Sequence, residues 1–213
     1  MKKLSKKEFE KRRKKALAII KALKKLFPNP RIALKYRNPW ELFVSVVLSA
    51  QCTDKQVNKV TAPLFRKYRT LGDYAKVGVK EFQKDIKSTG FYRNKAKNIL
   101  AAAKMLKQKF RGKIPRTMEE MLTLPGIGRK SANVILGNVY GVVEGIAVDT
   151  HVRRLSKKLG LTDHDDPAKI ERDLMKLIPR KEWFPITYRL IDYGRKYCAA
   201  RPHAHENCPL SRI

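Results

Sequence analysis

Acidic residues are scarce in this sequence of 213 residues: 19 Asp and Glu stand against 49 Lys and Arg, for a formal net charge of +30. A compact chain with such a surplus repels itself unless an anionic partner neutralises it. Nucleic acid is the partner we expect, because each phosphate neutralised by a cation releases condensed counterions. An acidic membrane surface is the alternative, and it would favour a basic amphipathic anchor.

Long apolar runs and a disulfide framework are also missing. The longest apolar run, Phe43 to Ala50, is far shorter than the ~18 residues that a transmembrane helix needs. Three cysteines, at 52, 198 and 208, do not suggest a secreted disulfide scaffold. The basic residues 1–7 precede no apolar stretch or small-residue cleavage site, so we expect no secretory leader. These absences predict an intracellular protein that does not enter the membrane.

Segments with strand-like alternation and repeats of fixed period are absent too, and helix signals dominate. Because 43% of the residues are hydrophobic, the chain can bury a proper core. Residues 6–27 combine a basic face with apolar side chains near helical spacing. These apolar residues are Ala16, Leu17, Ile20, Leu23 and Phe27. The sequence therefore predicts an all-α fold.

Capping residues mark several helix starts. Asn38 followed by Pro39 is typical of an N-cap and a first helical position, and this helix should run to about Ala50, mostly buried. Gln51 then falls in a tight connection before the next helix. Related signals mark three more starts, namely capping-box spacing at Thr53 with Gln56 and at Thr117 with Glu120, and Asp166 before Pro167.

One long stretch carries charge of a single sign, because no acidic residue lies between Asp85 and Glu119. Most charge runs are only solvated helix faces. A basic stretch of this length nevertheless favours contact with phosphates. Its cations are Lys87, Arg93, Lys95, Lys97, Lys104, Lys107, Lys109, Arg111, Lys113 and Arg116.

The segment LPGIGRKSA at 124–132 joins a helical segment at 117–124 to a second one that begins near residue 129. Gly126 and Gly128 permit a hairpin too tight for side chains, and Ile127 between them should plug into the core. The glycines also expose backbone N–H groups at the next helix start, which is a ready site for an anion. An ordinary tight helix–helix turn is the alternative.

Two other glycine-loop motifs are disfavoured at this hairpin. A dinucleotide-binding fingerprint needs a third glycine where Ser131 stands, and a phosphate-binding NTPase loop needs a glycine where Arg129 stands. Both motifs also follow a strand, and none is predicted here. The segment is therefore interpreted as a helical hairpin that meets phosphate through its main chain.

Lys130 lies in the first turn of the second helix of the hairpin. The positive end of the helix dipole disfavours a cation there by about 0.3–1 kcal/mol at an exposed site, and partial burial would add to the effect. A neutral amine is what Schiff-base chemistry requires. Lys130 is therefore a candidate nucleophile, although lysines in first turns also occur without such a role.

Asp149 and His151 follow a short run of small apolar residues. Asp149 is well placed as the N-cap of a helix that starts near Thr150, so it is either only a cap or a catalytic carboxylate. His151 is either a packing residue of the first turn or a contact to a ligand. The residue pattern alone leaves both pairs of alternatives open.

Four segments together resemble signature stretches of the endonuclease III family, which are helix–hairpin–helix DNA glycosylases. They are LSAQCTD at 48–54, TGFYRNKA at 89–96, LPGIGRKSA at 124–132 and VDTHVRR at 148–154. The resemblance implies two helical domains that flank a DNA-binding cleft. One is a six-helix barrel at 34–145 with the helix–hairpin–helix at 117–139, and the other combines 1–33 with 146–213.

The same resemblance implies a monomeric enzyme of base excision repair that acts on double-stranded DNA. It would remove oxidised pyrimidines and nick the strand, with Lys130 as the catalytic lysine and Asp149 as the catalytic aspartate. Gln51 would fill the hole left by a flipped nucleotide, and Phe91 would act as a wedge. The remaining DNA contacts implied are Gly126, Ile127, Gly128, Arg129, Ser131 and His151.

Family members usually carry four cysteines, spaced C-x6-C-x2-C-x5-C, that hold a [4Fe–4S] cluster. Here Cys198 and Cys208 match the first and third, His205 stands at the second, and the fourth would fall one residue past Ile213. Two cysteines and a histidine are a possible zinc ligand set, but the spacing is loose, and His203 and His205 are interpreted as surface residues. We therefore expect no cluster, no other metal and no cofactor, with the two cysteines as packing residues or a facultative disulfide.

Two further functions stay open. One is a mismatch glycosylase that removes thymine or uracil opposite guanine, and the other is a non-catalytic helical DNA-binding module. The pairing of Lys130 with Asp149 argues against the module. Base preference separates the two glycosylases, and it depends on pocket residues scattered along the chain.

Overall fold

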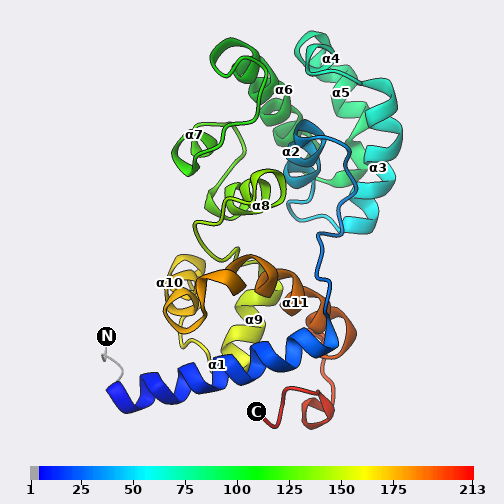
Figure 1. Cartoon of the computed structure of the whole chain (residues 1–213). Coiled ribbons are helices and arrows are strands. Elements are labelled where there is room, and N and C mark those ends of the chain that lie inside the picture. The colour runs from blue at the N-terminus through cyan, green and yellow to red at the C-terminus, as the bar shows by residue number, and fades with distance from the viewer. Residues whose placement is uncertain (1–4) are drawn as a thin grey trace. The chain divides into compact units, whose positions relative to one another are not determined.

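The computed structural model describes residues 5–213, and every regular element in that range is a helix (Figure 1). The predicted all-α fold is confirmed. Residues 1–4, which begin the segment where no leader is expected, lie outside the described range. No helix among residues 5–213 is both long and apolar enough to span a bilayer. The chain divides into two compact units, unit 1 from Met1–Ile32 with Val143–Ile213 and unit 2 from Ala33–Val142.

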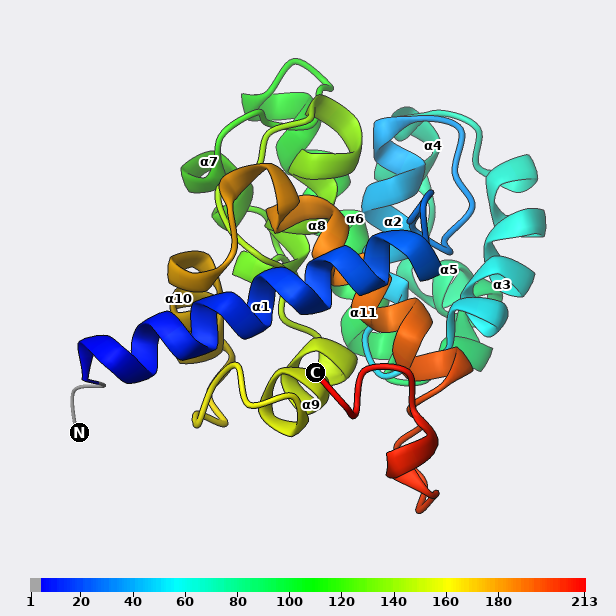
Figure 2. The same ribbon diagram turned by 60° about the horizontal axis from the view of Figure 1, so that its bottom comes forward.

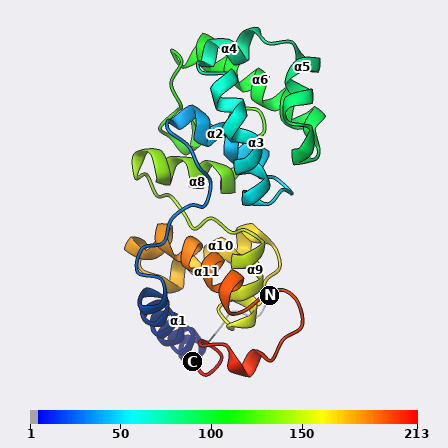
Figure 3. The same ribbon diagram turned by 90° about the vertical axis from the view of Figure 1, so that its right-hand side faces the viewer.

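Unit 2 is built around α2, which packs against α3, α6 and α8; Figure 3 shows α2 beside α3 and α8. Every residue of α2 from Glu41 to Leu48 is buried, as expected for a helix that is apolar on all sides. The helices of unit 2 are α2 (Pro39–Leu48), α3 (Asp54–Lys67), α4 (Leu71–Lys76), α5 (Val79–Asp85), η1 (Lys87–Thr89), α6 (Tyr92–Lys109), α7 (Met118–Leu122) and α8 (Arg129–Tyr140).

Unit 1 joins the N-terminal helix to the C-terminal third of the chain. Its helices are α1 (Lys6–Leu26), α9 (Thr150–Lys158), α10 (Pro167–Leu177), η2 (Arg180–Glu182), α11 (Trp183–Lys196) and η3 (His205–Asn207). Helix α1 crosses α10 and α11, as Figure 2 shows, and α11 packs on α9. A buried ion pair between Glu182 and Arg189, at 2.9 Å, lies at this junction, and Lys24 of α1 pairs with the same Glu182.

The capping residues predicted from the sequence start their helices as expected. Asn38 accepts a hydrogen bond from the Glu41 N–H, and Asp166 accepts one from the Lys169 N–H, each followed by Pro at the helix start. Thr53 caps α3 by accepting from the Gln56 N–H. The second half of that capping box is not formed, because the Gln56 side chain donates to Ser88 Oγ at 2.8 Å in the neighbouring η1.

The buried face of α1 differs from the predicted stripe at one position. Leu17 is 43% exposed, whereas Ile19 is buried. Residues 16, 19, 20 and 23 form the complete i, i+3, i+4, i+7 set, and position 17 lies at its edge. The face that packs on α10 and α11 is therefore rotated slightly from the predicted one.

Candidate functional site

The turn between α7 and α8 is a tight hairpin whose centre is fixed by Gly126. Gly126 has φ +81°, and a Cβ built there would lie 2.9 Å from Nδ2 of Asn98 on α6. Leu124 and Ile127 are buried on either side, and the Ile127 N–H donates to the Leu124 carbonyl at 3.2 Å. The predicted plug of Ile127 into the core is confirmed. Glycine is required at 126 both by its dihedral angle and by the approach of α6.

Helix α8 begins at Gly128 without any side chain that caps its first turn. A Cβ at Gly128 would meet nothing within 4 Å, so the space in front of the helix start is open. The N–H groups of an uncapped first turn, together with the helix dipole, attract an anion. Lys130 stands in this turn and is exposed. The partial burial considered for Lys130 is therefore absent.

Gln51 and Phe91 share an unusual backbone conformation. Their φ angles are +51° and +47°, and the only other non-glycine residue in 5–213 with positive φ is Arg111. An L-residue in this region costs roughly 1–2 kcal/mol. Phe91 is also 63% exposed, and Gln51 is exposed. Strained backbone beneath an exposed side chain is a feature often found at functional sites, so both positions are candidates for such a role.

Lys95 connects the two loops that carry Gln51 and Phe91. Its side chain is buried, and its Nζ donates to the carbonyl of Leu48 at 2.8 Å and to that of Thr89 at 2.7 Å. Leu48 ends α2 three residues before Gln51, and Thr89 lies two residues before Phe91. Burial lowers the pKa of Lys95.

The position of Lys95 corrects the reading of the basic stretch between Asp85 and Glu119. All its other cations are exposed, as a surface that meets phosphates requires. Lys95 instead binds main-chain carbonyls inside unit 2, so it offers no charge to a phosphate. One partner, Leu48, is 47 residues away, and a local pattern could not reveal it.

Asp149 is the N-cap of α9, and its Oδ1 accepts from the Val152 N–H at 2.8 Å. Its side chain is half-buried. The predicted N-cap is confirmed. The cap uses only Oδ1, so the second carboxylate oxygen of Asp149 takes no part in it. His151 lies in the first turn of α9. Its ring packs closely against Gly194 of α11, because a Cβ built on that glycine would lie 2.6 Å from His151 Nδ1. This contact fits the packing alternative for His151, while its role in DNA contact remains a prediction.

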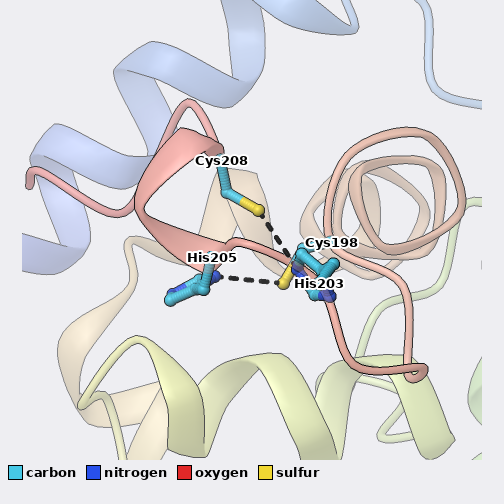
Figure 4. Close-up of side chains that lie close together, drawn as sticks. All are labelled: Cys198, His203, His205 and Cys208. Atoms are coloured by element: carbon cyan, nitrogen blue, oxygen red, sulfur yellow. Dashed lines mark hydrogen bonds between the residues drawn. The ribbon is translucent and has the colours of Figure 1, made fainter.

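Four residues near the end of unit 1 form a group that could hold a metal ion. Cys198, His203, His205 and Cys208 bring one ligand atom each to within 4.8 Å of one another (Figure 4). His203 is exposed, as the interpretation of the two histidines as surface residues expects, but both rings also lie beside the two cysteines, which the sequence spacing did not indicate. The chain after Cys198 turns back on itself through η3, so positions loosely spaced in sequence meet in space.

Comparison with known proteins gives one consistent family. Residues 44–180 match the model of the HhH-GPD superfamily base excision DNA repair protein. An endonuclease III of Synechocystis sp. is 47% identical over 202 residues, covering 95% of this chain and 92% of that protein. The structure of a non-covalent endonuclease III–DNA complex is 46% identical, with a TM-score of 0.90 and 94% of each chain covered. The structure of a trapped endonuclease III–DNA covalent intermediate is also 46% identical, with a TM-score of 0.85 over 98% of this chain and 94% of that one.

Proposed function

Because this chain belongs to the endonuclease III family and is a base excision repair glycosylase with lyase activity, we propose that Lys130 and Asp149 carry its reaction. The observation that carries the proposal is the exposed amine of Lys130 at the open, uncapped start of α8. Schiff-base chemistry requires an amine that can reach the substrate, and the Lys130 side chain is exposed at this helix start. The first turn beside it attracts the phosphates of the strand.

The proposed reaction begins when the lone pair of Lys130 Nζ forms a bond to C1′ of the damaged nucleotide. The bond from C1′ to the base breaks, and the base leaves with the electron pair. Loss of the amine proton and opening of the sugar give a Schiff base between Lys130 and C1′. Removal of a proton from C2′ then expels the 3′ phosphate by β-elimination, which nicks the strand.

Asp149 is proposed to stabilise the positive charge that develops on the sugar as the base leaves, or to assist the proton transfer. A fixed carboxylate lowers the energy of such a charge without reorganising. The cap supports this role, because the hydrogen bond from the Val152 N–H holds the carboxylate in one orientation. Capping and catalysis are compatible in one side chain.

Gln51 and Phe91 are proposed to handle the flipped nucleotide, Gln51 as the plug and Phe91 as the wedge. Taking a base out of the stack costs a few kcal/mol, and less for a lesion. An exposed ring that enters the duplex offsets part of this cost. The exposure of both side chains and the positive φ at both positions support the proposal, and Lys95 holds the two loops together.

The hairpin is proposed to grip the phosphate backbone mainly through its main chain. Gly126 and Gly128 allow the close approach, and Arg129 and Ser131 stand in the same first turn. Ile127 takes part only by its backbone, since its side chain is in the core. His151 is proposed as a further contact from unit 1.

The proposed substrate is double-stranded DNA with an oxidised pyrimidine or an abasic site, and the proposed unit of action is the intracellular monomer. An amine and a carboxylate supply the whole chemistry of both steps. We therefore propose that catalysis itself needs no cofactor.

Borohydride trapping tests the nucleophile. Wild type, Lys130→Ala and the control Lys25→Ala are incubated with a duplex that carries thymine glycol or an abasic site. Lys25 is an exposed lysine of α1 outside the proposed site. We expect a covalent adduct with wild type and with the control, and none with Lys130→Ala, which should still bind the duplex.

The other outcomes are equally clear. An undiminished adduct with Lys130→Ala would mean that another amine is the nucleophile. Base release by wild type without any adduct would indicate a glycosylase that uses water and acts on mismatched thymine or uracil. Binding with neither adduct nor base release would leave only a DNA-binding module.

A further inference from the structure

We propose that Cys198, His203, His205 and Cys208 form a structural site for one tetrahedral metal ion, and that the ion is zinc. The residues follow one another in the pattern C-x4-H-x-H-x2-C. Two thiolates and two imidazoles are a common ligand set of structural zinc sites.

The distances between sulfur and nitrogen match a single tetrahedral ion. With Zn–S of about 2.3 Å and Zn–N of about 2.0–2.1 Å, a tetrahedral angle places the two ligand atoms about 3.5 Å apart. Cys198 Sγ lies 3.6 Å from His205 Nδ1, and Cys208 Sγ lies 3.3 Å from His203 Nε2 (Figure 4). All four ligand atoms fall within 4.8 Å of one another. One ion at the centre can therefore reach all four.

The hydrogen bond behind His203 prepares this ring for a metal. Its Nδ1 lies 2.8 Å from the carbonyl oxygen of Arg201. A carbonyl only accepts, so Nδ1 carries the proton, and in the neutral ring Nε2, which faces Cys208, is the nitrogen left to bind a metal. Histidines that bind metals usually donate their other N–H to a carbonyl or carboxylate in this way, which fixes the tautomer and the ring plane.

The two cysteines are placed as buried ligands of such a site would be. Both are free and buried, so neither is exposed to solvent as an ordinary surface thiol. The guanidinium of Arg154 on α9 lies beside Cys198, with Nη1 3.8 Å from its Sγ and Nη2 donating to its carbonyl at 2.7 Å. Arg154 therefore holds the Cys198 side of the group in place from α9.

A [4Fe–4S] cluster does not fit these residues. It needs four thiolates, and the group contains two. A Rieske-type [2Fe–2S] centre does use two cysteines and two histidines, but it places both cysteines on one iron and both histidines on the other. Here each sulfur is paired with a ring nitrogen instead. The arrangement favours one ion, and its four protein ligands leave no open position for catalysis.

The ion would fasten the end of the chain to unit 1. Cys198 follows α11, and Cys208 precedes Leu210, which is buried and whose N–H donates to the Tyr193 hydroxyl at 3.2 Å. Arg154 extends the connection to α9, the helix that Asp149 caps. Because such a site does not exist in the unfolded chain, the free energy of metal binding becomes free energy of folding.

Metal analysis of the full chain is the first test. The protein is produced in medium that supplies both zinc and iron and is purified without chelator. We expect about one zinc per chain in wild type and in the control His164→Ala, a histidine outside the group. We expect loss of zinc in His203→Ala and in Cys208→Ala. His203 is exposed, so its removal should not disturb the fold by itself.

Thermal unfolding separates metal binding from mere packing. A chelator should lower the Tm of wild type by several degrees, to that of His203→Ala, and zinc should restore it. The Tm of His203→Ala should respond to neither. Substitution with Co²⁺ should give the visible absorption of a tetrahedral site together with thiolate-to-metal charge transfer.

Three results would each overturn the proposal. They are iron with acid-labile sulfide in place of zinc, a Cys198–Cys208 disulfide with no bound metal, and a zinc content of His203→Ala equal to that of wild type. None of these readouts involves DNA cleavage. A failure here is therefore distinguishable from a failure of the Lys130 assignment.

Discussion

The ammonium of Lys95 donates to the carbonyl of Leu48 at 2.8 Å, across a separation of 47 residues. Leu48 ends the helix before the Gln51 loop, and the second acceptor of Lys95, the Thr89 carbonyl, lies just before Phe91. One buried cation thus sets the spacing of the proposed plug and wedge. Lys95 does not touch DNA in this scheme, and it acts as a positioning residue.

Replacement of Lys95 tests this positioning role. Lys95→Met removes both hydrogen bonds and leaves two carbonyls without their donor, so we expect a loss of about 1.5–3 kcal/mol in the free energy of unfolding. Affinity for lesion-containing duplex should fall more than affinity for undamaged duplex. Denaturant unfolding and paired binding titrations measure the two effects. Lys104→Met, an exposed lysine of the same helix, is the control and should stay within about 0.5 kcal/mol.

The lowered pKa of Lys95 also predicts a pH dependence of stability. Below its folded-state pKa, the buried charge costs stability in full. As the pH rises from that value towards the unfolded value of about 10.4, the unfolded state binds more protons, so this contribution to stability rises. The free energy of unfolding, measured for wild type and for Lys95→Met and plotted against pH, should therefore differ in slope within this alkaline window. Parallel curves would show that Lys95 is not the group responsible.

Two substitutions of Asp149 separate its cap from its proposed chemistry. Asparagine is as good an N-cap as aspartate, so Asp149→Asn should keep its Tm but lose most of the base-release rate. Asp149→Ala should lose the rate and also about 0.5–2 kcal/mol of stability. Single-turnover kinetics and thermal unfolding are the measurements. Wild-type activity in Asp149→Asn would reduce Asp149 to a cap.

Phe91 offers a substitution that should help the fold and harm the function. Phe91→Gly relieves the positive φ, and little packing is lost, because the ring is 63% exposed. We expect a Tm equal to or above that of wild type, with up to about 1 kcal/mol gained. Engagement of a lesion should weaken, while non-specific duplex binding should change little. A lesion affinity equal to that of wild type would exclude the wedge role.

The same substitution at the two hairpin glycines should have opposite consequences. Gly126→Ser forces a side chain against Asn98 at positive φ, so we expect at least about 1–2 kcal/mol of lost stability. Gly128→Ser has room for its side chain and adds a good N-cap to α8, so stability should hold or rise. The new hydroxyl would occupy the first-turn N–H groups and weaken DNA binding. Undiminished DNA binding by Gly128→Ser would contradict the phosphate site.

Local signals predicted much of this fold because they act over a few residues. Asn38, Asp149 and Asp166 cap helices whose starts depend only on the next turn, and the sequence identifies all three. The hairpin around Ile127 follows equally from its glycines. The resemblance to a family added the proposed roles of Lys130 and Asp149, which no cap or stripe would reveal.

What the sequence did not reveal depends on distant partners. Lys95 has the same charge as its neighbours, and only its contact with Leu48 distinguishes it. The Gln56 side chain leaves its capping box because Ser88 is near. His203 and His205 form a group with two cysteines because the chain turns back, which spacing alone does not measure. In the first two cases the decisive distance lies between segments, and in the third it depends on a turn of the chain within one segment.

The contact of Gly126 with Asn98 sets unequal limits on how the two positions can change during evolution. Only a side chain at 126 would conflict with Asn98. With glycine at 126, a smaller residue at 98 therefore meets no steric conflict there, and position 98 can vary in this direction. The reverse does not hold, because the φ of +81° would still oppose any side chain at 126. Relatives that share this hairpin should therefore show variation at 98 beside an unchanging glycine, without the paired substitutions that mutual contacts usually leave.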